Sequence, residues 1–288
     1  MSQLIAELLA QCTFPPSATP VSCAVSGGAD SMALMVLAVN HGLHVTAHHV
    51  NHSLRDNSDT DVELVSSLAQ KLGVEVVTHR VSIEHGANLE ARARAARYGV
   101  LPSDIMTGHT ADDQAETMLI NLMRGAATQG LSAMTPGICR PLLQLRRTDT
   151  HALCAELDIS VVHDHTNDDT SYLRNNIRHN LLPAMNTMSQ RDLVPILMRA
   201  ANVMRDDNEL LDILAAALDP TDAVALTAAP IALARRALRT WLSHPYPPDQ
   251  ATIERVLMVA SGARLACDIG GGREIRRSKQ RLVLGSVR

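Results

Sequence analysis

The sequence predicts an α/β fold in which a parallel sheet has helices on both faces, followed by a smaller, mostly helical domain. Two observations lead to this prediction. Short apolar segments alternate with helical patterns through the first half of the 288 residues, and strand signals fade after about Pro141. Such alternation is typical of parallel sheets covered by helices. A chain of this length accommodates about two domains of roughly 150 residues each. We place them at residues 1–188 and 189–288.

Four strands are expected in the first half, and a helix follows each of them. The strand segments are short, apolar and rich in β-branched residues, whereas apolar residues recur at helical spacing in the segments between them. Ligands of such sheets bind beyond the carboxyl ends of the strands, so we expect the loops after the strands to converge. The expected strands are Val21–Val25, His44–Val50, Val74–Val81 and Ile105–Thr107, and the expected helices are Met32–Val39, Asp59–Leu72, Leu89–Tyr98 and Asp112–Arg124.

Helical patterns dominate the second half of the chain. Residues 218–230 and the proline-rich stretch 244–249 are expected to be connections between helices. The last segment, in which three glycines separate Arg264–Ile269 from Glu274–Leu284, resembles a short, arginine-rich β-hairpin or small sheet. The expected helices here are Arg147–Leu157, Leu173–Met185, Val194–Ala217 and Ile231–Leu242.

The composition excludes several classes of protein. With 46% hydrophobic and 19% charged residues, it is that of an ordinary globular protein. No run of about 18 apolar residues could span a bilayer, and the first residues lack the features of a secretory signal, so we expect a cytoplasmic location and no membrane partner. The five scattered cysteines include no C-x-x-C pair, which argues against a disulfide framework, a zinc ribbon or an iron–sulfur cluster. A net charge of −4 predicts no general affinity for nucleic acid.

The sharpest local signal is the hexapeptide Ser26-Gly27-Gly28-Ala29-Asp30-Ser31, which lies between an expected strand and a helix. Its two glycines let backbone N–H groups approach an anion, and the helix dipole adds positive potential. The serine hydroxyls could donate to phosphate oxygens, and Asp30 could orient the loop or hold a metal ion. The lysine-containing phosphate loop G-x-x-x-x-G-K-[ST] and the dinucleotide motif G-x-G-x-x-G are both absent. A plain glycine turn with a helix cap is the alternative.

Acidic residues follow the fourth expected strand. After His109, the helix begins with Asp112 and Asp113, and Glu116 lies on the same face as Asp113 because the two are three residues apart. Three acids at the carboxyl end of a strand favour a functional role. The alternative is that acids at a helix N-terminus only favour the helix dipole, by about 0.3–1 kcal/mol. The nearby histidines are irregularly spaced, which argues against a transition-metal site.

The hexapeptide resembles the signature of the PP-loop ATP pyrophosphatases, which cleave ATP between the α and β phosphates and share the adenine-nucleotide α-hydrolase-like fold. Further motifs narrow the match. In their order and spacing, over about residues 21–184, they resemble those of the tRNA(Ile)-lysidine synthetases. The matching segments are His49–Arg55, Glu90–Tyr98, Gly108–Thr117, Leu122–Gly125, Gly130–Met134, Arg140–Leu143, Arg174–Arg178 and Leu182-Pro183.

The resemblance implies a two-step reaction on a tRNA(Ile) with a CAU anticodon. ATP, with Mg²⁺, adenylates the ring oxygen of the wobble cytidine and releases pyrophosphate. The ε-amine of free L-lysine then attacks the activated ring carbon and expels AMP, which gives lysidine. Because the pKa of a lysine amine is about 10.4, presenting it as a nucleophile at neutral pH costs roughly 4–5 kcal/mol. Acids must therefore bind the cation, and a base must take its proton.

Roles for individual residues follow from these demands together with the resemblance. Asp30, Asp113, Glu116 and Arg124 are the catalytic candidates, and Asp113 with Glu116 is expected to bind lysine. The individual roles of the three helix acids and the oligomeric state stay open, and a homodimer is one option. The remaining candidates are Ser26–Ser31, His52 and Arg178 for ATP, Asp30 for Mg²⁺, and Arg94, Arg174, Arg273, Arg276 and Arg277 for tRNA.

Three alternatives remain at this point. tRNA thiolases of the PP-loop group usually need a cysteine pair or cluster, and the missing C-x-x-C counts against them. Amidating relatives need ammonia from a glutaminase domain or partner. A non-catalytic module of similar fold would bind ATP without turnover and would not need the carboxylates that follow His109.

Overall fold

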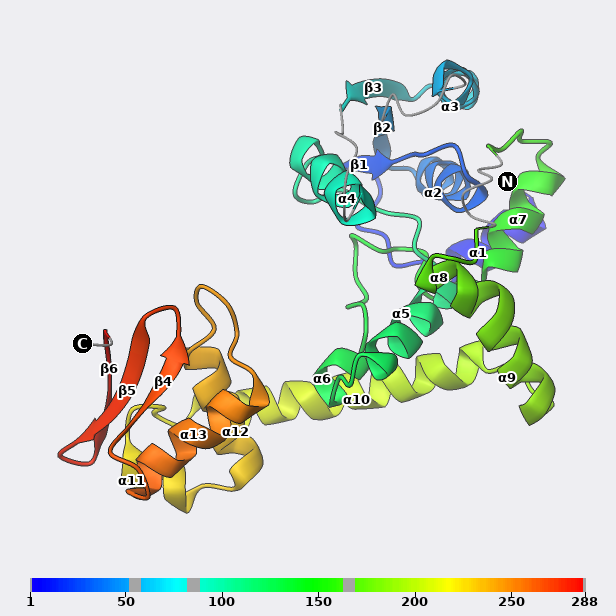
Figure 1. Cartoon of the computed structure of the whole chain (residues 1–288). Coiled ribbons are helices and arrows are strands. Elements are labelled where there is room, and N and C mark those ends of the chain that lie inside the picture. Colours follow the sequence, from blue (N-terminus) through cyan, green and yellow to red (C-terminus); the bar gives the residue numbers. More distant parts are fainter. Residues whose placement is uncertain (1, 52–57, 82–88, 163–168, 287–288) are drawn as a thin grey trace. The chain divides into compact units, whose positions relative to one another are not determined.

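A computed structural model describes residues 2–51, 58–81, 89–162 and 169–286 of the chain (Figure 1). The chain divides into two compact units, Met1–Asn202 and Val203–Arg288.

The first unit contains a parallel sheet in the order β1 (Pro20–Ala24), β2 (His44–Asn51), β3 (Glu75–Arg80). The expected fourth strand at Ile105–Thr107 is not a strand. Met106 lies beside β1 as an isolated bridge, in which its N–H donates to Ser22 O at 2.8 Å and its carbonyl accepts from Ala24 N at 2.9 Å. The N–H of Thr107, which faces away from β1, donates to Cys139 O at 3.0 Å.

Helices flank this sheet, as the sequence predicts, and Figure 1 shows α2 and α4 on opposite sides of β1. Two short helices, α1 and α6, were not expected, because segments of seven and four residues carry too little periodic pattern. The helices are α1 (Gln3–Leu9), α2 (Ala29–Asn40), α3 (Ser58–Leu72), α4 (Leu89–Val100), α5 (Ala111–Met123), α6 (Thr128–Leu131), α7 (Arg147–Glu156), α8 (Leu173–Asn176) and α9 (Leu182–Ser189), and α10 (Val194–Ala216) begins in this unit.

The single helix expected at Leu173–Met185 is interrupted by the π-helical segment η2 (Ile177–Leu181) between α8 and α9. Pro183 has no backbone N–H to donate, and the N–H of Leu182 donates to Ile177 O, five residues back. A one-turn π segment inside a helix is rare and is often found at functional sites, and this one carries Arg178.

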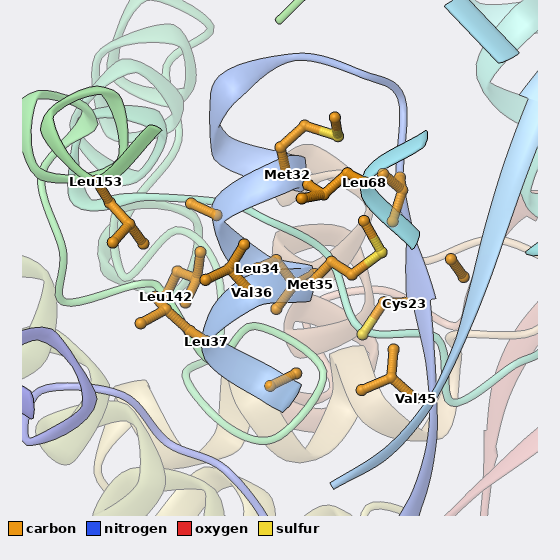
Figure 2. Close-up of a cluster of buried hydrophobic side chains, with 14 of the residues drawn as sticks. Cys23, Met32, Leu34, Met35, Val36, Leu37, Val45, Leu68, Leu142 and Leu153 are labelled. Atoms are coloured by element: carbon orange, nitrogen blue, oxygen red, sulfur yellow. The ribbon is translucent and has the colours of Figure 1, made fainter. Parts of the chain in front are cut away.

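The core of the first unit is built around α2, whose residues from Met32 to Ala38 are buried on every side. Figure 2 shows the α2 side chains between Leu142 and Leu153 on one side and Leu68 on the other. Each fully buried side chain of this size contributes about 1.5–3 kcal/mol. Because α2 contacts β1, β2, α3 and α7, the loop at its N-terminus is held from several directions.

A second apolar cluster fixes α5 within the same unit. Ala111, Ala115 and Leu119 of α5 pack with Ile177 of η2 and Val194 of α10. The acidic first turns of α5 therefore face the segment that carries Arg174 and Arg178.

The second unit combines helices with an antiparallel sheet of three strands in the order β4-β5-β6. Of the two options for the last segment, a hairpin or a small sheet, the structure has the small sheet, because Glu274–Leu284 turns at Lys279 and Gln280, whose φ values are 46° and 66°. Helix α11 lies within the expected connection 218–230, where Asp222 caps it by accepting from Val224 N and Ala225 N. The elements are α11 (Ala223–Ala228), α12 (Ile231–Trp241), α13 (Gln250–Ser261), β4 (Ala266–Gly270), β5 (Arg273–Ser278) and β6 (Arg281–Ser286).

Across the described ranges, no helix combines the length and the apolar character needed to cross a membrane.

Candidate functional site

The Ser26–Ser31 loop joins the end of β1 to the start of α2. Gly27 has a φ of +90°, and a Cβ on it would lie 2.6 Å from Val162 Cγ2, so glycine is required there. The Ser31 hydroxyl closes the loop, since it accepts from Ser26 N at 3.1 Å and donates to Gly28 O at 2.8 Å. Within the described part of the chain, the N–H groups of Gly28, Ala29 and Asp30 have no hydrogen-bond partner. Open N–H groups at a helix N-terminus form an anion-binding site.

The segment after the Met106 bridge touches this loop through its backbone. A Cβ on Gly108 would lie 2.6 Å from Asp30 O and 3.0 Å from Ser31 N. Only glycine permits so close an approach. Two of the loops expected to converge are therefore in direct contact, and α5 begins only three residues further on.

The three acids of α5 have different surroundings. Asp113 is buried, and its Oδ2 accepts from Thr110 N at 2.9 Å and from Thr110 Oγ1 at 3.0 Å, which caps the helix. Asp112 instead binds Arg146 through both carboxylate oxygens at 3.1 Å and accepts from Arg147 N at 2.8 Å. Asp112 therefore anchors the start of α7 and takes no part in the cluster described next.

Glu116, with only 1% of its side chain exposed, lies at the centre of an arginine cluster. Arg178 donates to it through Nε at 2.7 Å and Nη2 at 3.1 Å. Arg147 donates to Glu116 Oε1 from Nη1 and Nη2, both at 3.2 Å, and Nη2 also donates to Asp113 Oδ1 at 3.1 Å. Arg174 Nε lies 3.8 Å from Glu116 Oε2. The expected lysine-binding pair is thus together, and guanidinium groups occupy it.

Asp30 connects this cluster to the loop. Its Oδ1 accepts a short hydrogen bond from Thr150 Oγ1, and its Oδ2 lies 3.6 Å from Arg147 Nε. Arg147 and Thr150 both belong to α7, and the sequence analysis selected neither of them. The available signal was the arginine pair at the start of the expected helix Arg147–Leu157, which nothing in its spacing tied to the loop.

The site shifts the pKa values of its acids in opposite directions. Burial raises the pKa of Asp30, against the opposing hydrogen bond from Thr150 and the charge of Arg147. Burial alone would also raise the pKa of Asp113, but the charge of Arg147 and the backbone hydrogen bond from Thr110 outweigh it and the pKa is lowered. The acids raise the pKa of Arg147 despite its burial. At neutral pH, Asp113 and Arg147 are therefore a charged pair.

Other predicted site residues lie elsewhere. Arg124, the exposed C-cap of α5, is 12 residues beyond Asp112, which places it roughly 18 Å along the helix axis at about 1.5 Å per residue. The structure does not bring it to the loop. His52 lies outside the described residues, and so does the side chain of Arg94, whose backbone belongs to α4.

Three of the five arginines predicted to contact tRNA, Arg273, Arg276 and Arg277, belong to β5 of the second unit. Each of them contacts its own unit. Arg273 donates to His244 O, Arg276 pairs with Glu274, and Arg277 donates to Ala260 O at 2.6 Å.

Comparison with known families divides the chain in two. Residues 1–185 match the family model described as the PP-loop domain, and residues 222–283 match that of the TilS substrate binding domain. A solved structure of a U34-tRNA thiolase from Methanococcus maripaludis superposes with a TM-score of 0.54 at 15% identity, covering 70% of this chain and 80% of that one. This likeness shows the fold alone. The fold class expected from the sequence is confirmed.

Curated relatives match most of the chain. A tRNA(Ile)-lysidine synthase from Nocardia farcinica is 38% identical over 244 residues, which cover 79% of this chain and 77% of the relative. One from Rhodococcus erythropolis is 38% identical over 238 residues, which cover 77% and 73%. The family suggested by the motifs is confirmed by these relatives and by the two domain matches. The chain belongs to the tRNA(Ile)-lysidine synthase family.

Proposed function

We propose that this protein is an ATP-dependent ligase that joins free L-lysine to the wobble cytidine of a tRNA(Ile) with a CAU anticodon. The proposal rests on one observation: Arg147 contacts both Asp30 of the Ser26–Ser31 loop and the carboxylates of Asp113 and Glu116. The anion-binding loop and the carboxylate pair are therefore neighbours. One region binds phosphates and the other binds a cation. The chemistry needs both within one site, and the names of the curated relatives agree with it.

In the first step, the ring oxygen of cytidine attacks the α-phosphorus of ATP, and the bond to the departing pyrophosphate breaks. The open N–H groups of Gly28, Ala29 and Asp30 would donate to the phosphate oxygens as charge builds on them. Because these donors are fixed by the buried helix α2, they need no reorganisation during the reaction. Adenylation with loss of pyrophosphate is the outcome we propose.

Asp30 is the residue proposed to hold Mg²⁺. Its carboxylate is at the loop with 26% of its side chain exposed, and one carboxylate with phosphate oxygens and water is a common set of Mg²⁺ ligands. No group of three or more His, Cys, Asp or Glu side chains suited to a metal occurs among the described residues. Mg²⁺, when bound, neutralises charge on the phosphates.

In the second step, the lysine amine attacks the activated ring carbon, the bond to AMP breaks, and a proton leaves the amine. Asp113 and Glu116 would hold the ammonium group beforehand. The lowered pKa of Asp113 suits it to binding the cation and makes it a weak proton acceptor. We therefore assign Asp113 to binding and keep Glu116 as the candidate for both binding and proton transfer.

For the tRNA, we propose contacts at Arg174 in the first unit and at Arg273, Arg276 and Arg277 on β5. Replacing the three β5 arginines with glutamine should weaken tRNA binding and reduce its salt dependence, since each lost phosphate contact lowers the slope by about one. Filter binding at several salt concentrations measures the slope. An unchanged slope would remove β5 from the proposed tRNA surface.

The function is tested by incubating the protein with ATP, Mg²⁺, labelled lysine and total bacterial tRNA. We expect ATP-dependent transfer of label into tRNA, loss of transfer in Asp113→Asn, and normal transfer in Glu63→Gln, which removes an exposed acid of α3. Nucleotide binding without transfer would favour a non-catalytic module. Transfer from a sulfur or ammonia donor in place of lysine would favour another PP-loop enzyme.

A further inference from the structure

Arg147 touches acids from two separate parts of the site. Its Nε lies 3.6 Å from Asp30 Oδ2 in the Ser26–Ser31 loop, and its Nη2 lies 3.1 Å from Asp113 Oδ1 on α5. Nη1 and Nη2 are each 3.2 Å from Glu116 Oε1. One guanidinium is therefore shared between the nucleotide side, through Nε, and the amino-acid side, through Nη1 and Nη2.

Helix α7 fixes Arg147 in this position. Thr150 and Cys154 follow on the same face of α7, at spacings of three and four residues. Thr150 is fully buried and donates to Asp30 Oδ1, and Cys154 Sγ donates to Ala29 O at 3.5 Å. The face of α7 that carries Arg147 therefore packs directly on the first residues of α2.

A lysine ammonium that binds Asp113 and Glu116 would meet Arg147 on the same oxygens. Arg147 donates to Asp113 Oδ1 and Glu116 Oε1. Arg178 donates to both oxygens of Glu116, and its Nη2 lies 3.6 Å from Asp113 Oδ1. The other oxygen of Asp113 is occupied by the Thr110 cap. Since two cations compete for few free positions, the affinity for lysine depends on how firmly Arg147 is held there.

An anion on the Ser26–Ser31 loop changes that balance. Phosphates bound beside Asp30 add negative charge on the Nε side of Arg147. The guanidinium of Arg147 lies between Asp30 on one side and Asp113 and Glu116 on the other. The added negative charge then attracts it toward the loop and away from α5. Asp113 and Glu116 lose part of their present cation, and an incoming ammonium can replace it.

Resting on the proposed function, we propose that Arg147 is a positioning residue that couples the two substrates: nucleotide bound at the Ser26–Ser31 loop draws Arg147 off Asp113 and Glu116 and so strengthens lysine binding. By thermodynamic reciprocity, lysine strengthens nucleotide binding by the same factor.

Isothermal titration calorimetry on the full chain tests this coupling, with α,β-methylene ATP as a nucleotide that does not turn over. In the wild-type protein, we expect the nucleotide to lower the lysine Kd by about 5-fold or more, and lysine to lower the nucleotide Kd equally. L-Norleucine, which lacks the ε-ammonium group, should show no such dependence. These comparisons need no variant.

Variants then assign the effect to one side chain. Arg147→Gln should abolish the coupling, and Arg147→Lys, which keeps the charge and loses the fork, should restore part of it. The matched control is Arg199→Gln, which removes an exposed arginine of α10. Its coupling should equal that of the wild type.

The inference is overturned if the wild-type protein shows no coupling, or if a folded Arg147→Gln variant shows the same coupling as the wild type. Either result leaves lysine as the substrate. Failure of lysine to bind with and without nucleotide overturns the proposed function together with the inference. The two failures are thereby distinguished.

Discussion

Replacing Gly108 with alanine tests whether backbone contact between two loops builds the site. The new Cβ would lie 2.6 Å from Asp30 O, 0.8 Å short of the 3.4 Å at which ordinary van der Waals contact begins. Its other near neighbours, Asp30 C at 2.8 Å and Ser31 N at 3.0 Å, are also backbone atoms, which cannot turn aside as a side chain can. Either the Ser26–Ser31 loop or the segment leading to α5 must move by a large fraction of an ångström.

Overpacking of this kind costs about 1–3 kcal/mol of folding stability. A displacement of about 1 Å at a reacting centre lowers the rate by roughly 100-fold, which corresponds to about 2.7 kcal/mol and so matches the upper end of the stability loss. The assay pairs urea unfolding with steady-state kinetics of ATP-dependent transfer. We expect kcat/KM to fall by roughly 100-fold while the protein stays folded at room temperature.

Gly99→Ala provides the matched control. Gly99 lies near the end of α4, and a Cβ on it would have no atom within 4 Å. Alanine there should leave kcat/KM unchanged and stabilise the helix by about 0.5 kcal/mol or less. Wild-type kinetics in Gly108→Ala would refute the reasoning, since they would mean that the contact between the two loops does not set the geometry of the site.

Three further changes have definite expected results. Glu116→Gln removes the buried negative charge to which Arg147 and Arg178 donate. It should lower the free energy of unfolding, measured in urea, by about 3 kcal/mol and abolish lysine transfer. A decrease of less than about 1 kcal/mol in the free energy of unfolding would contradict the central position of Glu116. Thr150→Val removes a hydrogen bond that lowers the pKa of Asp30, so the carboxyl group ionises at a higher pH in the variant. The acidic limb of the pH profile of kcat/KM should therefore shift to higher pH. A limb that stays in place would show that another group causes it. Leu34→Ala, in the core of α2, should cost about 2–5 kcal/mol of stability and leave nucleotide affinity unchanged below the melting temperature; an affinity loss without a stability loss would place Leu34 in the site.

Much of the site could be predicted from the sequence, because its main parts follow segments that one α/β pattern brings to the same edge of a sheet. The Ser26–Ser31 loop follows β1. Asp113 and Glu116 lie on one face of the helix that follows the Met106 segment, which lies beside β1 although β2 and β3 come between them in the chain. Parallel strands bring such loops together whatever the details of the core. Local spacing was therefore enough to pair the loop with these two acids.

The position of Arg124 could have been judged from helix length. Arg124 is the C-cap of α5, whereas Asp112 and Asp113 lie in its first turn. The length of the helix therefore separates Arg124 from these acids. An arginine at that end of a helix also interacts favourably with the helix dipole.

Arg174 and Arg178 were candidates for tRNA and ATP, but their convergence with Arg147 on Glu116 could not be predicted, because α7, α8 and η2 are not placed against α5 by local sequence. Arg147 reaches the acids only because α7 packs on α2, and Arg178 only because η2 follows α8. These are long-range packing outcomes. The turn at Lys279 and Gln280 was missed for another reason, since both residues adopt a positive φ without being glycine.

The account depends most directly on where the two small substrates bind, and a crystal structure with α,β-methylene ATP and L-lysine measures this. We expect the phosphates on the N–H groups of Gly28, Ala29 and Asp30, and the lysine ε-ammonium within hydrogen-bond distance of Asp113 and Glu116. A nucleotide away from the Ser26–Ser31 loop, or a lysine held by other acids, would contradict the account.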